Sequence, residues 1–429
     1  MPGPDTVLDR IAGLILYRGV LADEAGRFYV DLVQGAVFKP LDRLTLTDLF
    51  SRLVRQLLTG RQFPSGVDPW AFHLADRVLY DENPFSLRAG WVSWAEVAPA
   101  LRRQAEAELS ALGELARFGL GELARMLGVG LALVDGPEAG ARPPGTADFR
   151  LRLATADNWA ALAPELAGHY LRNGVGLFGR YRAFRWQRRG GAGRLVPVEY
   201  PDPVRFSDLV GYDEQKAAVV ANTERLLAGL PALNVLLYGD RGTGKSSLVK
   251  ALVNEFGDRG LRLIELGRSD LRDYPEILAA VRNRPQKFIL MIDDLSFEEA
   301  ETEYKSLKSL LEGTLEARPR NLVVYATSNR RHLVREFFGD RPAPGDEVHP
   351  ADTQQEKLSL VDRFGLRVRF LAPDRDGYLK IVRSLAAGRQ LALDGRDLDA
   401  EALRWALSNG GWSGRTARQF VDSITVQNP

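Results

Sequence analysis

A glycine-rich turn between an apolar run and a helical pattern constrains this chain more than any other feature. The apolar run is NVLLYG, residues 234–239, and DRGTGKSSLVKALVNEF follows it directly. Gly239, Gly244, Lys245 and Ser246 match G-x-x-x-x-G-K-[ST], the spacing of a phosphate-binding loop. That motif requires a strand before it and a helix after it, and the flanking patterns predict both. A chance glycine-rich turn is therefore the weaker interpretation.

The chemistry of this loop predicts a nucleoside triphosphate as ligand. Glycines let backbone N–H groups surround a phosphate, and the positive end of the following helix adds to the attraction. We expect Lys245 to reach the β- and γ-phosphates of ATP, and the Ser246 hydroxyl to bind Mg²⁺. The residues expected to form this site are Gly239, Asp240, Arg241, Gly242, Thr243, Gly244, Lys245, Ser246 and Ser247.

A second buried run, FILMI at residues 288–292, stops at two adjacent aspartates. In proteins with a phosphate loop, a carboxylate at the end of such a strand holds Mg²⁺ through water, which makes Asp293 the candidate ligand. Its neighbour Asp294 is then placed to polarise the attacking water. The alternative is that both aspartates cap a following helix.

The rhythm of the apolar residues divides the chain. Residues 1–186 read as a mainly helical domain; in TDLFSRLVRQLL, for example, Thr47 is a candidate cap. Glycines, prolines and arginines give residues 187–203 the composition of a linker. Residues 204–373 alternate short apolar runs with helical stretches, which indicates an α/β domain with a parallel sheet covered by helices. Residues 374–429 read as a small helical lid that begins with a capping aspartate.

Five of these apolar runs are predicted strands of the sheet: 234–239, 261–267, 287–293, 321–328 and 368–373. Hydrophobic content of 45% and charged content of 26% are typical of a globular protein with a sizeable core. A net charge of +1 gives no general attraction to nucleic acid or to an anionic membrane. The chain has no cysteine, which excludes disulfides, thiolate metal sites and a cysteine nucleophile.

Two observations predict a cytoplasmic protein without a membrane segment. The first residues, MPGPDTVLDRIAGLILYRG, lack the basic lead of a signal peptide. The most apolar later window, residues 126–134, is shorter than the roughly 20 residues that a membrane-spanning helix needs.

From Phe206 onward the chain resembles the AAA+ ATPases, and the resemblance covers residues 204–429. FSDLVGYDEQ is similar to the segment that precedes the phosphate loop in that superfamily. The resemblance implies that Val210, Gly211 and Tyr212 line the pocket for adenine.

Further residues carry the resemblance along the chain. Asn329, at the end of YATSN, looks like the sensor 1 residue that orients water beside the γ-phosphate. SLVDRFGLRVRF is similar to the segment that delivers an arginine finger, which implies Arg363. WSGRTARQF implies Arg415 as sensor 2, with Arg418 one turn later as the fallback. The full pattern looks most like a group of bacterial predicted AAA+ ATPases without an assigned role.

This resemblance implies a function as well as a fold. An AAA+ ATPase of this kind hydrolyses MgATP between subunits of a ring or arc, six by family likeness, and remodels a client that the sequence does not identify. The chain departs from the commonest pattern at Asp294, where glutamate is usual. A shorter side chain places the base less well, which suggests slow hydrolysis.

Two alternatives stay open. The protein could be a nucleotide-gated switch that binds ATP and changes its assembly with little turnover. It could also be a helicase-loader-like ATPase, since GRYRAFRWQRR, residues 179–189, interleaves arginines with Tyr181, Phe184 and Trp186. That composition is typical of a nucleic-acid groove, although arginines beside a linker also serve to dock domains.

Overall fold

The computed structural model describes residues 3–38, 41–59, 63–131, 146–295, 311, 319–329, 361–389, 391 and 397–425. The chain forms two compact units, Met1–Arg180 and Tyr181–Pro429. Each has its own hydrophobic core, so each is described separately.

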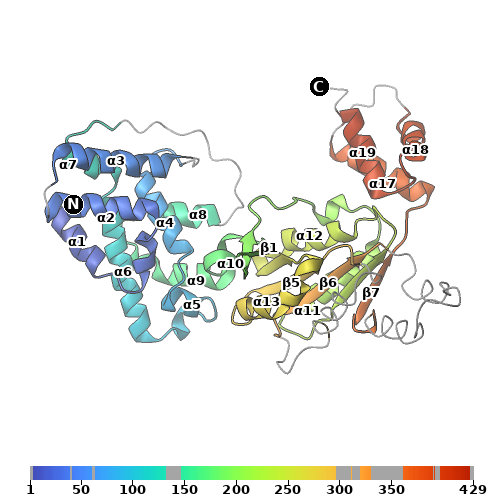
Figure 1. Ribbon diagram of the computed structural model, residues 1–429, viewed down its shortest axis with the longest axis horizontal. Coiled ribbons are helices and arrows are strands. Elements are labelled where there is room, and N and C mark those ends of the chain that lie inside the picture. Colours follow the sequence, from blue (N-terminus) through green and yellow to red (C-terminus); the bar gives the residue numbers. More distant parts are fainter. Residues whose placement is uncertain are drawn as a thin grey trace. The chain divides into compact units, whose positions relative to one another are not determined.

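The first unit is helical in its described part, as expected (Figure 1). Its longer helices are α1 (Pro4–Ala12), α2 (Glu24–Val37), α3 (Arg43–Leu58), α4 (Pro69–Leu79), α5 (Pro84–Ala89), α6 (Pro99–Arg117), α7 (Leu120–Leu127), α8 (Thr146–Thr155), α9 (Ala163–Asn173) and α10 (Gly176–Arg180). Helix α4 is buried along most of its length, and its Trp70 ring stacks on Tyr29 of α2 with centroids 4.0 Å apart. Large aromatic contacts of this kind make α4 the centre of the unit.

The start of α3 differs from the sequence prediction. Asp42, and not Thr47, caps the helix, because the Asp42 side chain accepts a hydrogen bond from the Thr45 backbone N–H. Thr47 lies inside the helix, where its hydroxyl donates to the Arg43 carbonyl at 2.7 Å. An aspartate one turn upstream offers the stronger acceptor for the free N–H groups, and Leu46 extends the apolar face to meet it.

The second unit is built on one sheet of seven strands in the order β2-β1-β4-β5-β6-β3-β7. Their bounds are Ala183–Arg189 (β1), Ala192–Pro197 (β2), Val235–Gly239 (β3), Leu261–Glu265 (β4), Lys287–Ile292 (β5), Leu322–Ser328 (β6) and Leu366–Phe370 (β7). All neighbours are parallel except β1 and β2. The five predicted strands are confirmed as β3 to β7.

Helices cover this sheet, as the runs of buried strand residues require. Every residue of β6 is buried, so both of its faces are covered. Helices α11 (Asp213–Leu227) and α12 (Lys245–Phe256) contribute to one core with alternate residues of the strands, for example Val249 with Val235 and Ile289. A further helix, α13 (Tyr274–Val281), follows β4.

The predicted linker is wrong for most of its length. Residues 187–197 belong to β1, to β2 and to the turn between them, and the boundary between the two units falls after Arg180. The glycines at 190 and 191 form the hairpin turn, with φ of 58° and 86°. The arginines of β1 have acidic partners on β4 and beyond it, so their exposure could not be judged from local composition.

The lid consists of α17 (Arg375–Gly388), α18 (Leu398–Ser408) and α19 (Gly414–Thr425). Tyr378, Ala402 and Phe420, one from each helix, share its core. Asp374 caps α17 by accepting from the Gly377 N–H at 2.8 Å, which confirms the predicted cap. None of the helices in the described ranges has both the length and the apolar character that crossing a membrane would take.

Candidate nucleotide-binding site

A cleft of about 530 Å³ lies where the phosphate loop, the ends of β5 and β6, and the lid meet. The predicted site residues that line it are Val210, Tyr212, Gly242, Thr243, Gly244, Lys245, Ser246, Ser247, Asp293, Asp294, Asn329 and Arg415, together with the fallback Arg418. The described lining does not include Gly211, Gly239, Asp240, Arg241 and Arg363. The structure thus brings twelve of the seventeen predicted residues to one cavity.

Two glycines give the loop its shape. Gly239 has φ of 129°, and a Cβ atom there would lie 1.9 Å from the Phe370 carbonyl oxygen on β7. Gly244 has φ of 90° at the start of α12. Residues with a Cβ rarely adopt such a backbone, so the two positions need glycine for conformation and, at Gly239, also for space.

Lys245 lies under the loop and is only 5% exposed. Its Nζ donates to the carbonyl oxygens of Gly239, at 3.0 Å, and of Asp240, at 2.6 Å. Burial lowers the pKa of Lys245 to about 8, although the nearby carboxylates of Asp240, Asp293 and Asp294 oppose the shift. The loop's own carbonyls therefore hold the ammonium group at the cleft.

Asp293 is joined to the phosphate loop by a short hydrogen bond. The Ser246 hydroxyl donates to Asp293 Oδ1 at 2.6 Å, and the Thr327 hydroxyl donates to the same oxygen at 2.5 Å. Thr327 also accepts from the Asp294 backbone N–H at 2.9 Å. Sequence reasoning missed Thr327, although its place two residues before Asn329 at the end of β6 is a signal that could have found it.

Asp294 has both carboxylate oxygens in contact with other side chains. Asn329 donates through Nδ2 to Oδ1, and the Arg268 guanidinium lies 3.4 Å from Oδ2. The Asp294 backbone is left-handed, with φ of 54°, which is uncommon for a residue other than glycine. The structure thus brings the predicted pair Asp294 and Asn329 together and adds Arg268. The alternative cap function concerns residues 296–310, which lie outside the described residues.

Tyr212 occupies the part of the cleft where the resemblance places adenine. Its backbone lies in the left-handed region, with φ of 57°, and its hydroxyl donates to the Leu371 carbonyl at 2.6 Å. Burial, helped by the nearby Asp240 carboxylate, raises its pKa to about 12. Val210, on the same segment, packs against the core of the lid. This segment therefore connects the sheet unit to the lid beside the cleft.

The phosphate loop contacts the lid and its connection at two further points. The Asp240 carboxylate accepts from the Ala372 backbone N–H at 2.7 Å, just after β7 ends. The Gly242 carbonyl accepts from the Arg415 backbone N–H at 3.3 Å, at the start of α19. Asp240 therefore binds the lid connection rather than lining the cleft, which local sequence did not indicate.

Arg363 lies near the amino-terminal ends of the strands, whereas the phosphate loop follows the carboxyl end of β3. It precedes β7 by three residues, and Leu366 at the start of β7 pairs with Val235 at the start of β3. The phosphate loop begins at the other end of β3. The two ends of β3 are four residue steps of about 3.3 Å apart, or about 13 Å, and the residues between Arg363 and β7 add to this separation. The Arg363 side chain cannot reach the nucleotide cleft of its own chain.

The aromatic–arginine segment 179–189 exposes less of the pattern of a nucleic-acid groove than its composition suggested, because two of its three rings are buried. Phe184 and Trp186 are buried in the unit, so their rings cannot stack on bases. Arg185 pairs with Glu265 at 2.8 Å, and Arg188 pairs with Asp273 at 2.8 Å. These residues join β1 to the rest of the sheet.

The fold and the cleft together define the class of this protein. A phosphate loop follows β3, two acids follow β5, a polar residue follows β6, and a helical lid closes the cleft. This is the architecture of the AAA+ superfamily of nucleotide-binding proteins. Within it, the chain belongs to the family described as "Protein of unknown function (DUF815)", whose model matches residues 179–428.

Curated relatives agree with this class. The chain is similar to the replication factor C large subunit of Thermofilum pendens, with 42% identity over 81 residues, 18% of this chain and 19% of that protein. It is also similar to the ATP-dependent zinc metalloprotease FtsH of Methylibium petroleiphilum, with 31% identity over 57% of this chain and 42% of that protein. The chain thus spans less than half of the length of either relative.

Among solved structures, one match is the Thermotoga maritima RuvB Holliday junction branch migration motor. It has 14% sequence identity and a TM-score of 0.37, and the match covers 52% of this chain and 65% of that chain.

Proposed function

We propose that this protein binds MgATP in the cleft and hydrolyses it slowly, between subunits of a homo-oligomer, to remodel a client protein. The observation that carries the proposal is the contact between Ser246 and Asp293, 2.6 Å apart beside the buried Lys245. These two oxygen groups come from elements 47 residues apart and meet where the phosphate loop ends. ATP dependence in the name of the FtsH relative supports the choice of nucleotide.

The donors at this point fit magnesium. A serine hydroxyl and a carboxylate oxygen are hard ligands of the kind that Mg²⁺ takes, with phosphate oxygens and water completing its shell. When bound, Mg²⁺ supplies charge neutralisation at the phosphate oxygens. Ser246 and Asp293 would hold it, and Thr327 keeps the Asp293 carboxylate in place through its hydroxyl hydrogen bond.

The remaining residues have distinct roles in the proposed hydrolysis. Lys245 and Arg415 hold phosphate oxygens, and Asn329 orients Asp294 and the attacking water. Water adds to the γ-phosphorus, its proton passes to Asp294, and the bond between the γ-phosphorus and the ADP oxygen breaks. Both Asp294 oxygens have side-chain partners, so one contact must open for a water to be accepted.

Arg363 completes the site of a neighbouring subunit in this proposal. Because Arg363 lies near the amino-terminal ends of the strands, its side chain cannot reach the cleft of its own chain, which supports action in trans. An arginine supplied in trans is worth about 10³–10⁵ in rate in related phosphoryl transfers. A ring or arc of six subunits is the arrangement that the AAA+ resemblance implies.

A nucleotide-gated switch with little turnover is the second candidate. The double contact on Asp294 favours it, because a base held on both oxygens polarises water poorly. The helicase-loader alternative loses support, because the rings of Phe184 and Trp186 are buried.

Steady-state phosphate release with ATP and Mg²⁺ tests the proposal and separates the candidates. We expect slow release by the unaltered protein and background release by Asp294→Asn and by Arg363→Ala, with ATP binding intact in both. Arg367→Ala is the matched control for Arg363, because Arg367 is an exposed arginine on β7 that pairs with Asp362.

Mixing the two inactive variants tests the action in trans. Some interfaces of a mixed oligomer combine an intact Asp294 with an intact Arg363, so activity should return in the mixture. Mixtures that stay inactive while they assemble would contradict the role of Arg363. Tight ATP binding without any release by the unaltered protein would favour the switch.

A further inference from the structure

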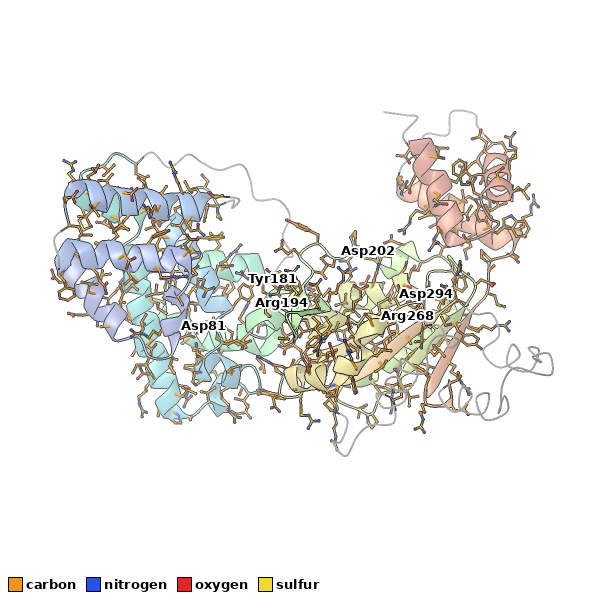
Figure 2. All side chains as sticks on the ribbon, in the orientation of Figure 1. Asp81, Tyr181, Arg194, Asp202, Arg268 and Asp294 are labelled. Carbon is orange, nitrogen blue, oxygen red and sulfur yellow. The ribbon has the colours of Figure 1, made fainter. Side chains whose placement is uncertain are left out.

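The two acids after β5 line the same cleft, although they are neighbours in sequence. Successive side chains of a regular strand point to opposite faces of the sheet, so a regular continuation of β5 would separate Asp293 from Asp294. Asp294 (labelled in Figure 2) is one of two residues other than glycine with a positive φ in the described part of the chain, at 54°. The backbone therefore leaves the regular strand at Asp294.

The hydrogen bonds between β5 and β6 locate the irregularity. Phe288 on β5 donates its backbone N–H to the Asn321 carbonyl at 2.7 Å. The bonds of a parallel ladder repeat every second residue, so the Asp294 N–H would meet the Thr327 carbonyl if the ladder continued. The Leu295 N–H takes that carbonyl instead, at 2.6 Å. Asp294 is thus one extra residue on the β5 side of the ladder, which is a β-bulge.

The hydroxyl of Thr327 replaces the ladder bond that the bulge removes. It accepts from the Asp294 N–H at 2.9 Å and donates to Asp293 Oδ1 at 2.5 Å. Because a hydroxyl has a single proton and the Asp294 N–H is itself a donor, that proton is directed to Asp293. Thr327 is only 2% exposed, so water does not compete for these two bonds. One buried side chain therefore holds the bulge and the first acid together.

The bulge determines where the Asp294 carboxylate lies. Bulges bend a strand and re-aim a side chain, and they are frequent next to active sites. Here the Asp294 carboxylate meets the Asn329 amide, which donates to its Oδ1 just after β6 ends. A left-handed backbone is unfavourable for a residue with a Cβ, so it persists only where surrounding contacts fix it. The hydrogen bond from Asp294 to Thr327 is such a contact.

We propose that Thr327 is a positioning residue for the hydrolysis of ATP. Its hydroxyl holds the bulge that turns Asp294 into the cleft, and it fixes the Asp293 carboxylate for Mg²⁺. Valine has the same shape and suits a buried strand as well as threonine does, so packing alone does not require a hydroxyl here. The effects on rate and on Mg²⁺ rest on the proposed function, whereas the effect on the bulge does not depend on nucleotide.

Hydrogen exchange at Asp294 tests the bulge without nucleotide. Thr327→Val removes the acceptor of the Asp294 N–H, so this amide should exchange at least about fivefold faster. Ser328→Ala is the matched control, because it also removes one buried hydroxyl from β6, and in the described part of the chain that hydroxyl has no hydrogen-bond partner. The control should exchange like the unaltered protein. Equal exchange in Thr327→Val and Ser328→Ala would overturn the proposal.

Calorimetric titration of ATP tests the effect on Asp293. Titrations with Mg²⁺ and with a chelator give the gain in ATP affinity that Mg²⁺ provides. Loss of a group that orients a metal ligand typically lowers metal affinity about 10–100-fold, so Thr327→Val should reduce this gain about tenfold or more. The affinity for metal-free ATP should stay unchanged. Thr327→Ser keeps the hydroxyl and should keep the gain, and a Thr327→Ser protein that behaves like Thr327→Val would overturn the proposal.

Phosphate release tests the effect on Asp294. At saturating Mg²⁺ and ATP, Thr327→Val should lower kcat at least about tenfold with KM unchanged, because a misplaced base slows the chemical step and not binding. Thr327→Ser should restore most of the rate. A raised KM with unchanged kcat would overturn the positioning of Asp294. If the unaltered protein binds MgATP but releases no phosphate, the proposed hydrolysis fails, and the exchange and titration results still decide whether Thr327 holds the bulge and Asp293.

Discussion

The two units of this protein use buried polar groups in different ways. In the helical unit, Glu108 of α6 is buried, and its carboxylate accepts from the backbone N–H groups of Leu16 and Tyr17, at 3.0 and 2.9 Å. These partners all belong to the fold itself. In the sheet unit, Lys245 and Asp293 also have protein partners, but they stand at the wall of an open cleft.

A second hydrogen-bond network in the helical unit also joins groups that belong to the fold itself. The hydroxyls of Tyr17 and Tyr170 lie 3.3 Å apart, and Tyr170 donates to the Val78 carbonyl at 2.6 Å. Burial raises the pKa of both tyrosines. Satisfied buried networks of this type fix one packing arrangement. The comparison therefore teaches that buried polarity specifies structure in the first unit and prepares a ligand site in the second.

Glu108→Ala should destabilise the helical unit and leave the nucleotide site unchanged. It leaves two backbone donors without their acceptor, the buried Tyr17 N–H and the partly buried Leu16 N–H, which we expect to cost about 3 kcal/mol of stability. Hydrogen exchange should accelerate in α1, in α6 and around Tyr17, while α12 and β3 keep their protection. ATP affinity should stay unchanged.

Glu106→Ala is the control for this experiment, because Glu106 lies on the same helix and is partly exposed. It should change stability by less than about 0.5 kcal/mol. Loss of ATP binding in Glu108→Ala would contradict the division of roles between the units.

Asp273 offers a smaller test within the sheet unit. Burial opposes its ionisation, but the hydrogen bonds from Arg188 and Trp186 prevail and hold its pKa below the ordinary value of 3.8. The ionised Asp273 therefore stabilises the hairpin above pH 3.8, and this contribution is lost as the pH falls through the lower, folded-state pKa. At pH 7, Asp273→Asn should cost about 1–2 kcal/mol.

The pH dependence gives this prediction its check. Thermal midpoints of the unaltered protein and of Asp273→Asn should differ at pH 7 and approach each other below pH 3.8. A difference that stays constant over this range would show that the Asp273 charge is not what holds β1 and β2.

Local patterns predicted the parts of the site that depend on neighbours in sequence. The apolar runs gave the five strands, and the motif gave the loop that ends at Ser246. Asp293 could be placed because the carboxyl ends of parallel strands share one edge. These predictions needed no knowledge of distant contacts.

The errors and omissions have one physical origin. The linker assignment failed because Arg188 finds its acidic partner 85 residues further along the chain, at Asp273. Asp240 occupies a position that the motif leaves free, and its bond to Ala372 spans 132 residues. Arg268 carries no local signal at all, because the residue that it contacts, Asp294, follows a different strand, β5. Composition and periodicity do not report pairings over such separations.

The central claim is that the phosphate loop and the acids after β5 form one site for MgATP. Calorimetric titration of ATP with Mg²⁺ into the full chain tests it most directly, with Lys245→Ala and the neighbouring Lys250→Ala in parallel. Lys250 lies on the same helix and pairs with Asp202, away from the described cleft lining. We expect one ATP bound per chain in the unaltered and Lys250 proteins and no measurable binding to Lys245→Ala. No binding to the unaltered chain, or equal binding to all three proteins, would contradict the account.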